Sequence, residues 1–166
     1  MNDLTMRGIV STLDLITLIL RFSIGHKGFC GDLRQFYTSI LIENDQFNLQ
    51  RVLMVEDLDM NNEVIEMIIV TLIFGIRAVS ALSEHAVIKL ASFITQTNPR
   101  LGELLMDSRF CDDLADSETN TEKIDKLTAE ADSLFESVGL RCKGWSKTGS
   151  PPHKDVTADG HTVNVA

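Results

Sequence analysis

The sequence predicts an α+β protein whose helices pack on one face of an antiparallel-rich sheet. The first supporting observation is the order of the elements, since a helical segment comes first and is followed by strands that two further helical segments interrupt. The second is a hairpin-like stretch in which two acidic residues stand between short apolar pairs. A chain of 166 residues with 44% hydrophobic content can also bury the core of one domain.

One helix and three strands are expected in the first half of the chain. Apolar residues nearly surround the segment 11–24, which predicts a mostly buried helix. The apolar segments 29–33 and 50–55 are typical of short strands. The β-branched run 64–74 predicts a strand long enough to cross a sheet, and Gly75 ends it.

Two helices are expected in the second half. Apolar residues share one side of the segment 80–95, and the pair Asn98-Pro99 breaks the pattern. The clearest helix begins at 119–122, where Thr and Glu match a capping box, and it ends at Gly139. Its apolar residues recur at spacings of three and four, at Ile124, Leu127, Ala131, Leu134 and Val138. A strand over 140–145, a turn-rich loop over 147–152 and a short strand in the tail complete the chain.

The most distinctive stretch is Phe110-Cys111-Asp112-Asp113, which reads as a strand followed by a tight turn that carries the acids. Upstream, Asp32 lies at the end of another apolar strand. If the two strands are neighbours in one sheet, Asp32 and Asp112 face each other and can share a divalent metal ion, as metal-assisted phosphoryl transfer requires. A solvated acidic turn is the competing interpretation, because the chain has 24 acidic residues.

The net charge of −9 argues against free-standing nucleic-acid binding, because phosphate contacts require clustered Lys and Arg. Six other acidic residues are interpreted as surface charge, namely Glu43, Asp45, Glu56, Asp57, Asp59 and Asp116.

The three cysteines, Cys30, Cys111 and Cys142, form no paired motif and are odd in number, so neither a disulfide framework nor a zinc site is expected. The simplest interpretation is that they are small, buried hydrophobic residues in a reducing compartment. This predicts an intracellular, cytoplasmic protein. The first residues lack the pattern of a signal peptide, and the longest apolar run, 68–76, is too short to span a bilayer. No membrane association is therefore expected.

Four blocks follow one another in the order and approximate spacing of a reverse transcriptase palm. These blocks are 31–41, 71–91, 110–113 and 138–146. The third is similar to the Tyr/Phe-x-Asp-Asp box of that family. The segments 50–57 and 142–146 in particular resemble Bel/Pao-type LTR retrotransposon polyproteins, and the resemblance extends over nearly the whole chain.

This resemblance implies a polymerase palm-like fold with fingers and thumb largely missing. Residues 1–146 would form the palm-like core, and 147–166 a loop and a truncated strand leading toward a missing primer-grip and thumb region. The implied activity is that of an RNA-directed DNA polymerase, which transfers a nucleotide from dNTP to a primer 3′-hydroxyl on an RNA or DNA template. The isolated fragment is expected to be inactive without the other polyprotein domains, namely fingers, thumb, RNase H and integrase. The alternative is a degenerate non-catalytic relic, or an interaction module that retains the palm scaffold.

The resemblance also assigns a metal site. Asp32 and Asp112 would bridge two Mg²⁺ ions, with Mn²⁺ as a possible substitute, because both metals prefer hard oxygen ligands. The Leu33 carbonyl would complete one site, and Asp113 would support it. Because clustered carboxylates repel one another, at least one should have a raised pKa without metal.

Three further residues are expected to bind substrate by the same resemblance. Tyr37 would act as a gate against the ribose 2′-hydroxyl, or it is simply a core aromatic. Lys143 would lie near the leaving phosphates, where a cation stabilises departing charge, or it is a surface lysine. Gly75 would permit a tight turn near the nucleotide, although the Ser-Pro that many reverse transcriptases carry just after this glycine is absent.

Overall fold

The computed structural model has one four-stranded sheet, two separate two-stranded sheets and four α-helices among the residues that it describes. Those residues are 6–9, 14–55, 61–150, 154–156 and 162–164. Within this part of the chain, no helix combines the length and the apolar character that crossing a membrane requires.

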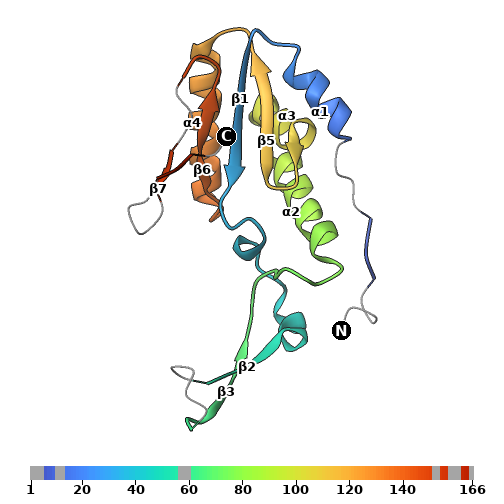
Figure 1. The fold of residues 1–166 in the computed structure, drawn as a ribbon. Coiled ribbons are helices and arrows are strands. Elements are labelled where there is room, and N and C mark those ends of the chain that lie inside the picture. The colour runs from blue at the N-terminus through green and yellow to red at the C-terminus, as the bar shows by residue number, and fades with distance from the viewer. Residues whose placement is uncertain (1–5, 10–13, 56–60, 151–153, 157–161, 165–166) are drawn as a thin grey trace.

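The main sheet is antiparallel throughout and has the order β4-β5-β1-β6. Its strands are β1 (Lys27–Leu33), β4 (Arg109–Phe110), β5 (Asp113–Glu118) and β6 (Cys142–Lys147). The strand expected over 29–33 therefore lies beside the strand that follows the acidic turn, and Figure 1 shows β1 and β5 side by side. The expected α+β class with antiparallel sheets is confirmed.

Helices α2 (Val79–Ile94), α3 (Pro99–Asp107) and α4 (Thr121–Ser137) lie on one side of this sheet (Figure 1). Alternate residues of β1 point toward them, because successive side chains of a strand project to opposite faces. Phe29 and Leu33 are therefore buried, and they pack with α2, α3 and α4 in one core. The core residues contributed by the helices include Val87, Ala91, Leu101, Leu104, Ile124, Ala131 and Phe135. We call the other side of the sheet, which α2–α4 leave uncovered, the open face.

Helix α1 (Leu15–Phe22) is more exposed than its apolar sequence predicts. Only Leu18 is buried, so the expectation of a mostly buried helix is wrong for the described residues. The reason is that α1 lies at the edge of the sheet against β4 and β5 and is not enclosed by the core. Its last residue, Phe22, places its ring where a side chain on Gly28 would be. Residues 11–13 of the expected helix lie outside the described residues.

Strands β2 (Arg51–Val55) and β3 (Val64–Ile68) form a hairpin that extends away from the main sheet (Figure 1). The expectation that 64–74 crosses a sheet is wrong, because β3 pairs with β2 alone among the described strands and ends at Ile68. Beyond it, Thr71 makes only an isolated bridge to Leu41. One face of the hairpin is entirely apolar and is exposed to solvent. This face consists of Val52, Met54, Ile65 and Met67.

Helix α3 is absent from the elements that the sequence predicts. Asn98-Pro99 was expected only to break the preceding helix, but it also starts the next one. The Asn98 side chain accepts a hydrogen bond from the Leu101 amide at 3.1 Å, and Pro99 occupies the first helical turn. An Asn directly before a Pro is a common helix start, so this signal was available in the sequence.

Helix α4 begins one residue later than the expected capping box. Its N-cap is Asn120, whose side-chain oxygen accepts a hydrogen bond from the Lys123 amide at 2.9 Å. The expected end at Gly139 is confirmed by its positive φ of 77°. The short strand in the tail is β8 (Thr162–Asn164), which pairs with β7 (Lys154–Val156).

Replacing Asn120 by alanine is expected to lower the free energy of unfolding by about 1 kcal/mol, because the Lys123 amide loses its acceptor. Urea denaturation would measure the change. Thr119→Ala serves as the control and should change stability much less. Equal losses in the two variants would contradict the assignment of Asn120 as the cap.

Candidate active site

Three aspartates meet at one end of the main sheet. Asp32, near the end of β1, is the direct antiparallel partner of Asp113, the first residue of β5. Directly opposed residues project to the same face with Cβ atoms about 5 Å apart, so these two carboxylates share the open face. Asp112 precedes Asp113 in the hairpin loop, and its carbonyl accepts a hydrogen bond from the Leu33 amide at 2.9 Å. The register thus sets Asp32 opposite Asp113, whereas the sequence predicted Asp112.

The hairpin loop is short and conformationally unfavourable. Phe110 pairs with Asp113, which leaves Cys111 and Asp112 as its two loop residues. Two-residue hairpin loops need a positive φ at one or both positions, and Cys111 supplies it with φ 55°. A residue with a side chain rarely adopts this conformation, so surrounding contacts must hold the loop.

Lys143 lies beside Asp32 because β6 contains an irregularity. The register between β1 and β6 shifts between Gly31 and Leu33, as in a β-bulge. The Lys143 ammonium nitrogen lies 2.8 Å from Asp32 Oδ2. The other oxygen, Asp32 Oδ1, is buried and has no hydrogen-bond partner among the described residues. Lys143 therefore neutralises one aspartate of the group and leaves one buried oxygen unsatisfied.

The carboxylates repel one another in the metal-free protein. Partial burial raises the pKa of Asp113, and the charges of Asp112 and Asp32 raise it further, whereas Lys143 lowers it. This confirms the expectation that at least one carboxyl of the group has a raised pKa. A divalent cation at this position would relieve the same repulsion.

Asp113→Asn is expected to raise the stability of the metal-free protein at pH 7. A raised pKa means that the fold disfavours the ionised carboxylate, so ionised Asp113 reduces stability at pH values above that pKa. Solvent screening limits the gain to about 1 kcal/mol. The gain should vanish below about pH 4, where the wild-type carboxyl is protonated in both states. Denaturation at the two pH values would measure it.

Asp125→Asn is the matched control for that comparison. Asp125 is an exposed aspartate on α4 and pairs with Lys147 at 2.7 Å. Its replacement removes an attraction, so stability at pH 7 should stay equal or fall. A gain of the same size in both variants would indicate a general effect of the acidic net charge.

Tyr37 forms one wall beside the acidic hairpin. It begins the 3₁₀ turn η1 (Tyr37–Ser39), and its ring centroid lies 5.2 Å from that of Phe36 and 5.1 Å from that of Phe74. Burial raises the pKa of Tyr37, and the nearby Cys111 and Asp112 raise it further. Tyr37 is thus a packed aromatic that also lies close to the aspartates. The two roles expected for it, a core aromatic and a gate against the ribose 2′-hydroxyl, are therefore compatible.

Gly75 adopts a φ of 89°, as the expected tight turn requires, and no other atom lies within 4 Å of where its side chain would be. It directly follows Phe74, whose ring contacts Tyr37. The turn therefore adjoins the aromatic wall of the site.

The side chains that converge at this end of the sheet offer few ligands for a metal ion. In the described part of the chain, no group of three or more His, Cys, Asp or Glu side chains is arranged to hold a metal ion. Mg²⁺ however usually takes only one or two protein carboxylates and completes its shell with water and substrate phosphates. The facing pair Asp32 and Asp113, together with the unsatisfied oxygen of Asp32, fits that donor set.

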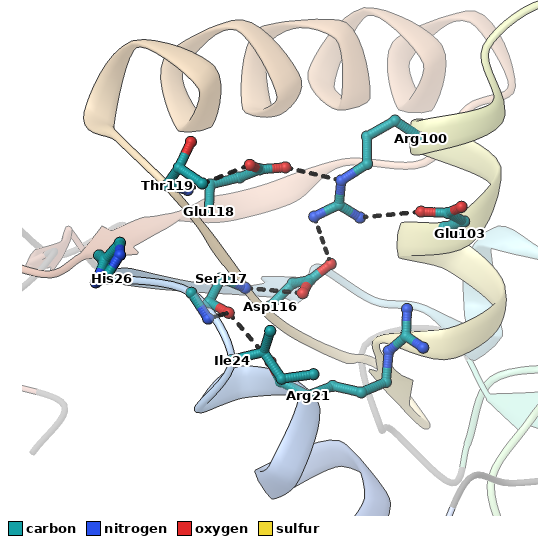
Figure 2. A pocket seen from close by; sticks show the side chains of 10 residues that line it. Arg21, Ile24, His26, Arg100, Glu103, Asp116, Ser117, Glu118 and Thr119 are labelled. Atoms are coloured by element: carbon teal, nitrogen blue, oxygen red, sulfur yellow. Dashed lines mark hydrogen bonds and ion pairs between the residues drawn. The ribbon is translucent and has the colours of Figure 1, made fainter.

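A concavity of about 360 Å³ lies at the opposite end of β1 and β5 (Figure 2). Arg100 crosses it and binds Asp116 and Glu118, each at 2.8 Å. Ser108 donates a further hydrogen bond to Asp116, also at 2.8 Å. The interpretation of Asp116 as surface charge is wrong, because it is buried and paired. These groups satisfy one another, so the concavity is better explained as a structural ion-pair network than as a site.

No protein-family model matches the chain, and no curated protein matches it.

Proposed function

We propose that this chain is the palm of a reverse transcriptase of the Bel/Pao retrotransposon type, whose reaction is two-metal transfer of a nucleotide from dNTP to a primer 3′-hydroxyl. The observation that carries the proposal is the placement of Asp32 opposite Asp113, with Asp112 in the adjoining loop, on the open face of an antiparallel sheet. Segments about eighty residues apart in the sequence are brought together there. The four ordered sequence blocks are the independent support.

In this mechanism the three aspartates and the Leu33 carbonyl would hold Mg²⁺. The bound metal would supply activation of the 3′-hydroxyl and neutralisation of the leaving pyrophosphate. Tyr37 would limit the space beside the sugar, because its ring is held by Phe36 and Phe74. The open face is the only side from which a primer terminus can approach Asp32 and Asp113, since α2–α4 cover the other side within the described chain.

Lys143 has two successive partners in this proposal. Without metal its ammonium neutralises Asp32 at 2.8 Å. With a divalent ion held by Asp32, the Lys143 ammonium would instead bind the leaving phosphates, where a cation stabilises the transition state. Lys143 therefore competes with the metal for the Asp32 carboxylate in the free protein, and it binds substrate once the metal is bound.

Lys143→Ala is expected to tighten Mn²⁺ binding by about two- to fivefold, because it removes a partly exposed cation that competes for Asp32. Calorimetric titration would measure the affinity. Lys147→Ala is a charge-matched control, since Lys147 lies on the same strand but pairs with Asp125. Equal changes in both variants would point to net charge alone.

The proposal is tested by metal binding to the wild-type chain and to Asp112→Asn. Wild-type protein should bind Mn²⁺ weakly, as seen in water-proton relaxation, and Asp112→Asn should abolish that binding. Asp125→Asn, an exposed acid on α4, should leave it unchanged. Binding that survives Asp112→Asn, or that falls equally in both variants, would show a diffuse acidic surface.

The alternative is a non-catalytic relic or interaction module that retains the palm scaffold. The ion pair between Lys143 and Asp32 favours it, because a cation of the chain itself already occupies one aspartate. The Lys143→Ala titration separates the two, since a relic would acquire no Asp112-dependent metal site when the lysine is removed.

A further inference from the structure

Arg109, one residue before Phe110 in the acidic hairpin, is buried together with Glu84 of α2. Only 4% of the Arg109 side chain and 11% of the Glu84 side chain are exposed, and Arg109 Nη2 lies 2.8 Å from Glu84 Oε2. A buried ion pair contributes little net stability, because removing two charges from water costs about as much as their attraction returns. We therefore expect the pair of Arg109 and Glu84 to have a role other than stabilising the fold.

All three guanidinium nitrogens of Arg109 have partners. Besides Glu84, Nη1 donates to the Cys111 carbonyl at 2.5 Å, and Nε donates to the Leu105 carbonyl of α3 at 3.4 Å. The guanidinium carbon also lies 6.0 Å from the centre of the Phe36 ring. One side chain thus joins α2, α3, the hairpin loop and the aromatic wall.

The hydrogen bond to Cys111 restrains the peptide plane that precedes Asp112, and the Leu33 amide holds the Asp112 carbonyl that follows. The Cys111 carbonyl belongs to the peptide plane that continues into the Asp112 nitrogen. Cys111 itself has the unfavourable φ of 55°, so this plane would turn easily without a constraint. Arg109 fixes the plane by its hydrogen bond, and Glu84 fixes Arg109 in turn.

We propose that Glu84 and Arg109 are positioning residues that hold Asp112 in the geometry needed to bind a divalent cation beside Asp32. This inference rests on the function proposed above, and neither residue contacts the metal. Arginine suits the task because its planar guanidinium holds its N–H donors in fixed directions, toward the Glu84 carboxylate and the Cys111 carbonyl, whereas lysine is a point charge on a flexible stem.

The test replaces the pair by apolar residues in the variant Glu84→Leu/Arg109→Met. Such a replacement of a buried ion pair often preserves folding. The affinity for Mn²⁺ per folded molecule is expected to fall about tenfold, while circular dichroism and the melting temperature stay close to wild type. Glu84→Gln, which can still accept from Arg109, should keep an affinity within about threefold of wild type.

Arg100→Gln is the control for a merely structural effect. Arg100 holds a comparable ion-pair network at the other end of the same strands, with Asp116 and Glu118 (Figure 2). Its replacement should lower stability without changing Mn²⁺ affinity per folded molecule. Equal losses of affinity in this control and in the double variant would overturn the inference.

A conservative single variant gives a readout that a purely structural role would not change. Arg109→Lys keeps the positive charge beside Glu84 but lacks the planar guanidinium, and it should weaken Mn²⁺ binding per folded molecule severalfold. If the apolar double variant does not fold, this single Arg109→Lys comparison decides.

The outcomes separate the two proposals. Wild-type protein without Asp112-dependent Mn²⁺ binding would overturn both. Wild-type binding that a folded Arg109 variant retains in full would overturn the positioning role alone.

Discussion

Gly31→Ala is expected to destabilise the protein by about 3 kcal/mol, because β1 has no room for a side chain at this position. An added Cβ would lie 2.7 Å from Trp145 Cε3 and 2.9 Å from Cys142 Sγ. The Trp145 ring has little freedom to move, since its nitrogen donates to Asp132 at 2.9 Å and the ring packs at a tilt against Phe29. Urea denaturation monitored by tryptophan fluorescence would measure the loss.

A second substitution identifies the cause of that loss. Trp145→Val alone removes ring packing and should also destabilise, but in its background Gly31→Ala should cost clearly less than in the wild type, because the contact with the ring is gone while that with Cys142 Sγ remains. Strict additivity of the two changes would mean that the clash with the ring is not the origin. Because Gly31 directly precedes Asp32, the same close contact also fixes the strand that carries the aspartate.

The second large effect is expected for Asp113→Asn in a polymerase chimera, where it should reduce primer extension. The isolated chain should show no processive primer extension, because its net charge of −9 disfavours phosphate binding. Grafting fingers and thumb from an intact related element should restore extension. In that chimera, Asp113→Asn should reduce the rate by at least about a hundredfold, because metal-ion stabilisation of the transition state amounts to several kcal/mol.

Gel-based primer extension would measure the rate. The control variant Asp125→Asn should retain the rate of the unmodified chimera. Tyr37→Ala should increase ribonucleotide incorporation in the same chimera. A folded chimera that stays inactive with all three aspartates present would favour the relic. Robust extension by the unmodified chain would contradict the need for the other domains.

Local sequence patterns predicted the elements that build the candidate site. Apolar pairs on both sides of the acids predicted a hairpin with both acids in its turn, whereas the two loop residues are Cys111 and Asp112 and Asp113 begins β5. The spacing of Val87 and Ala91 predicted the buried side of α2, and an apolar run predicted the strand that carries Asp32. These predictions succeed because hairpins and amphipathic helices depend on residues close in sequence.

Charged residues were harder to interpret, because their partners lie far away in the chain. Asp116 reads as surface charge until Arg100 is placed beside it, and nothing near Arg109 in the sequence indicates Glu84. Burial of a charge depends on whether folding brings its counter-ion close, which composition cannot reveal.

By itself, the sequence determined the α+β class, the acidic hairpin and the candidate aspartates. Only the tertiary structure decided that Asp32 faces Asp113, that Lys143 neutralises Asp32, and that Arg109 holds the loop. The physical reason is that strand register and bulges arise from pairing between distant segments, and a shift of one residue turns every side chain to the other face.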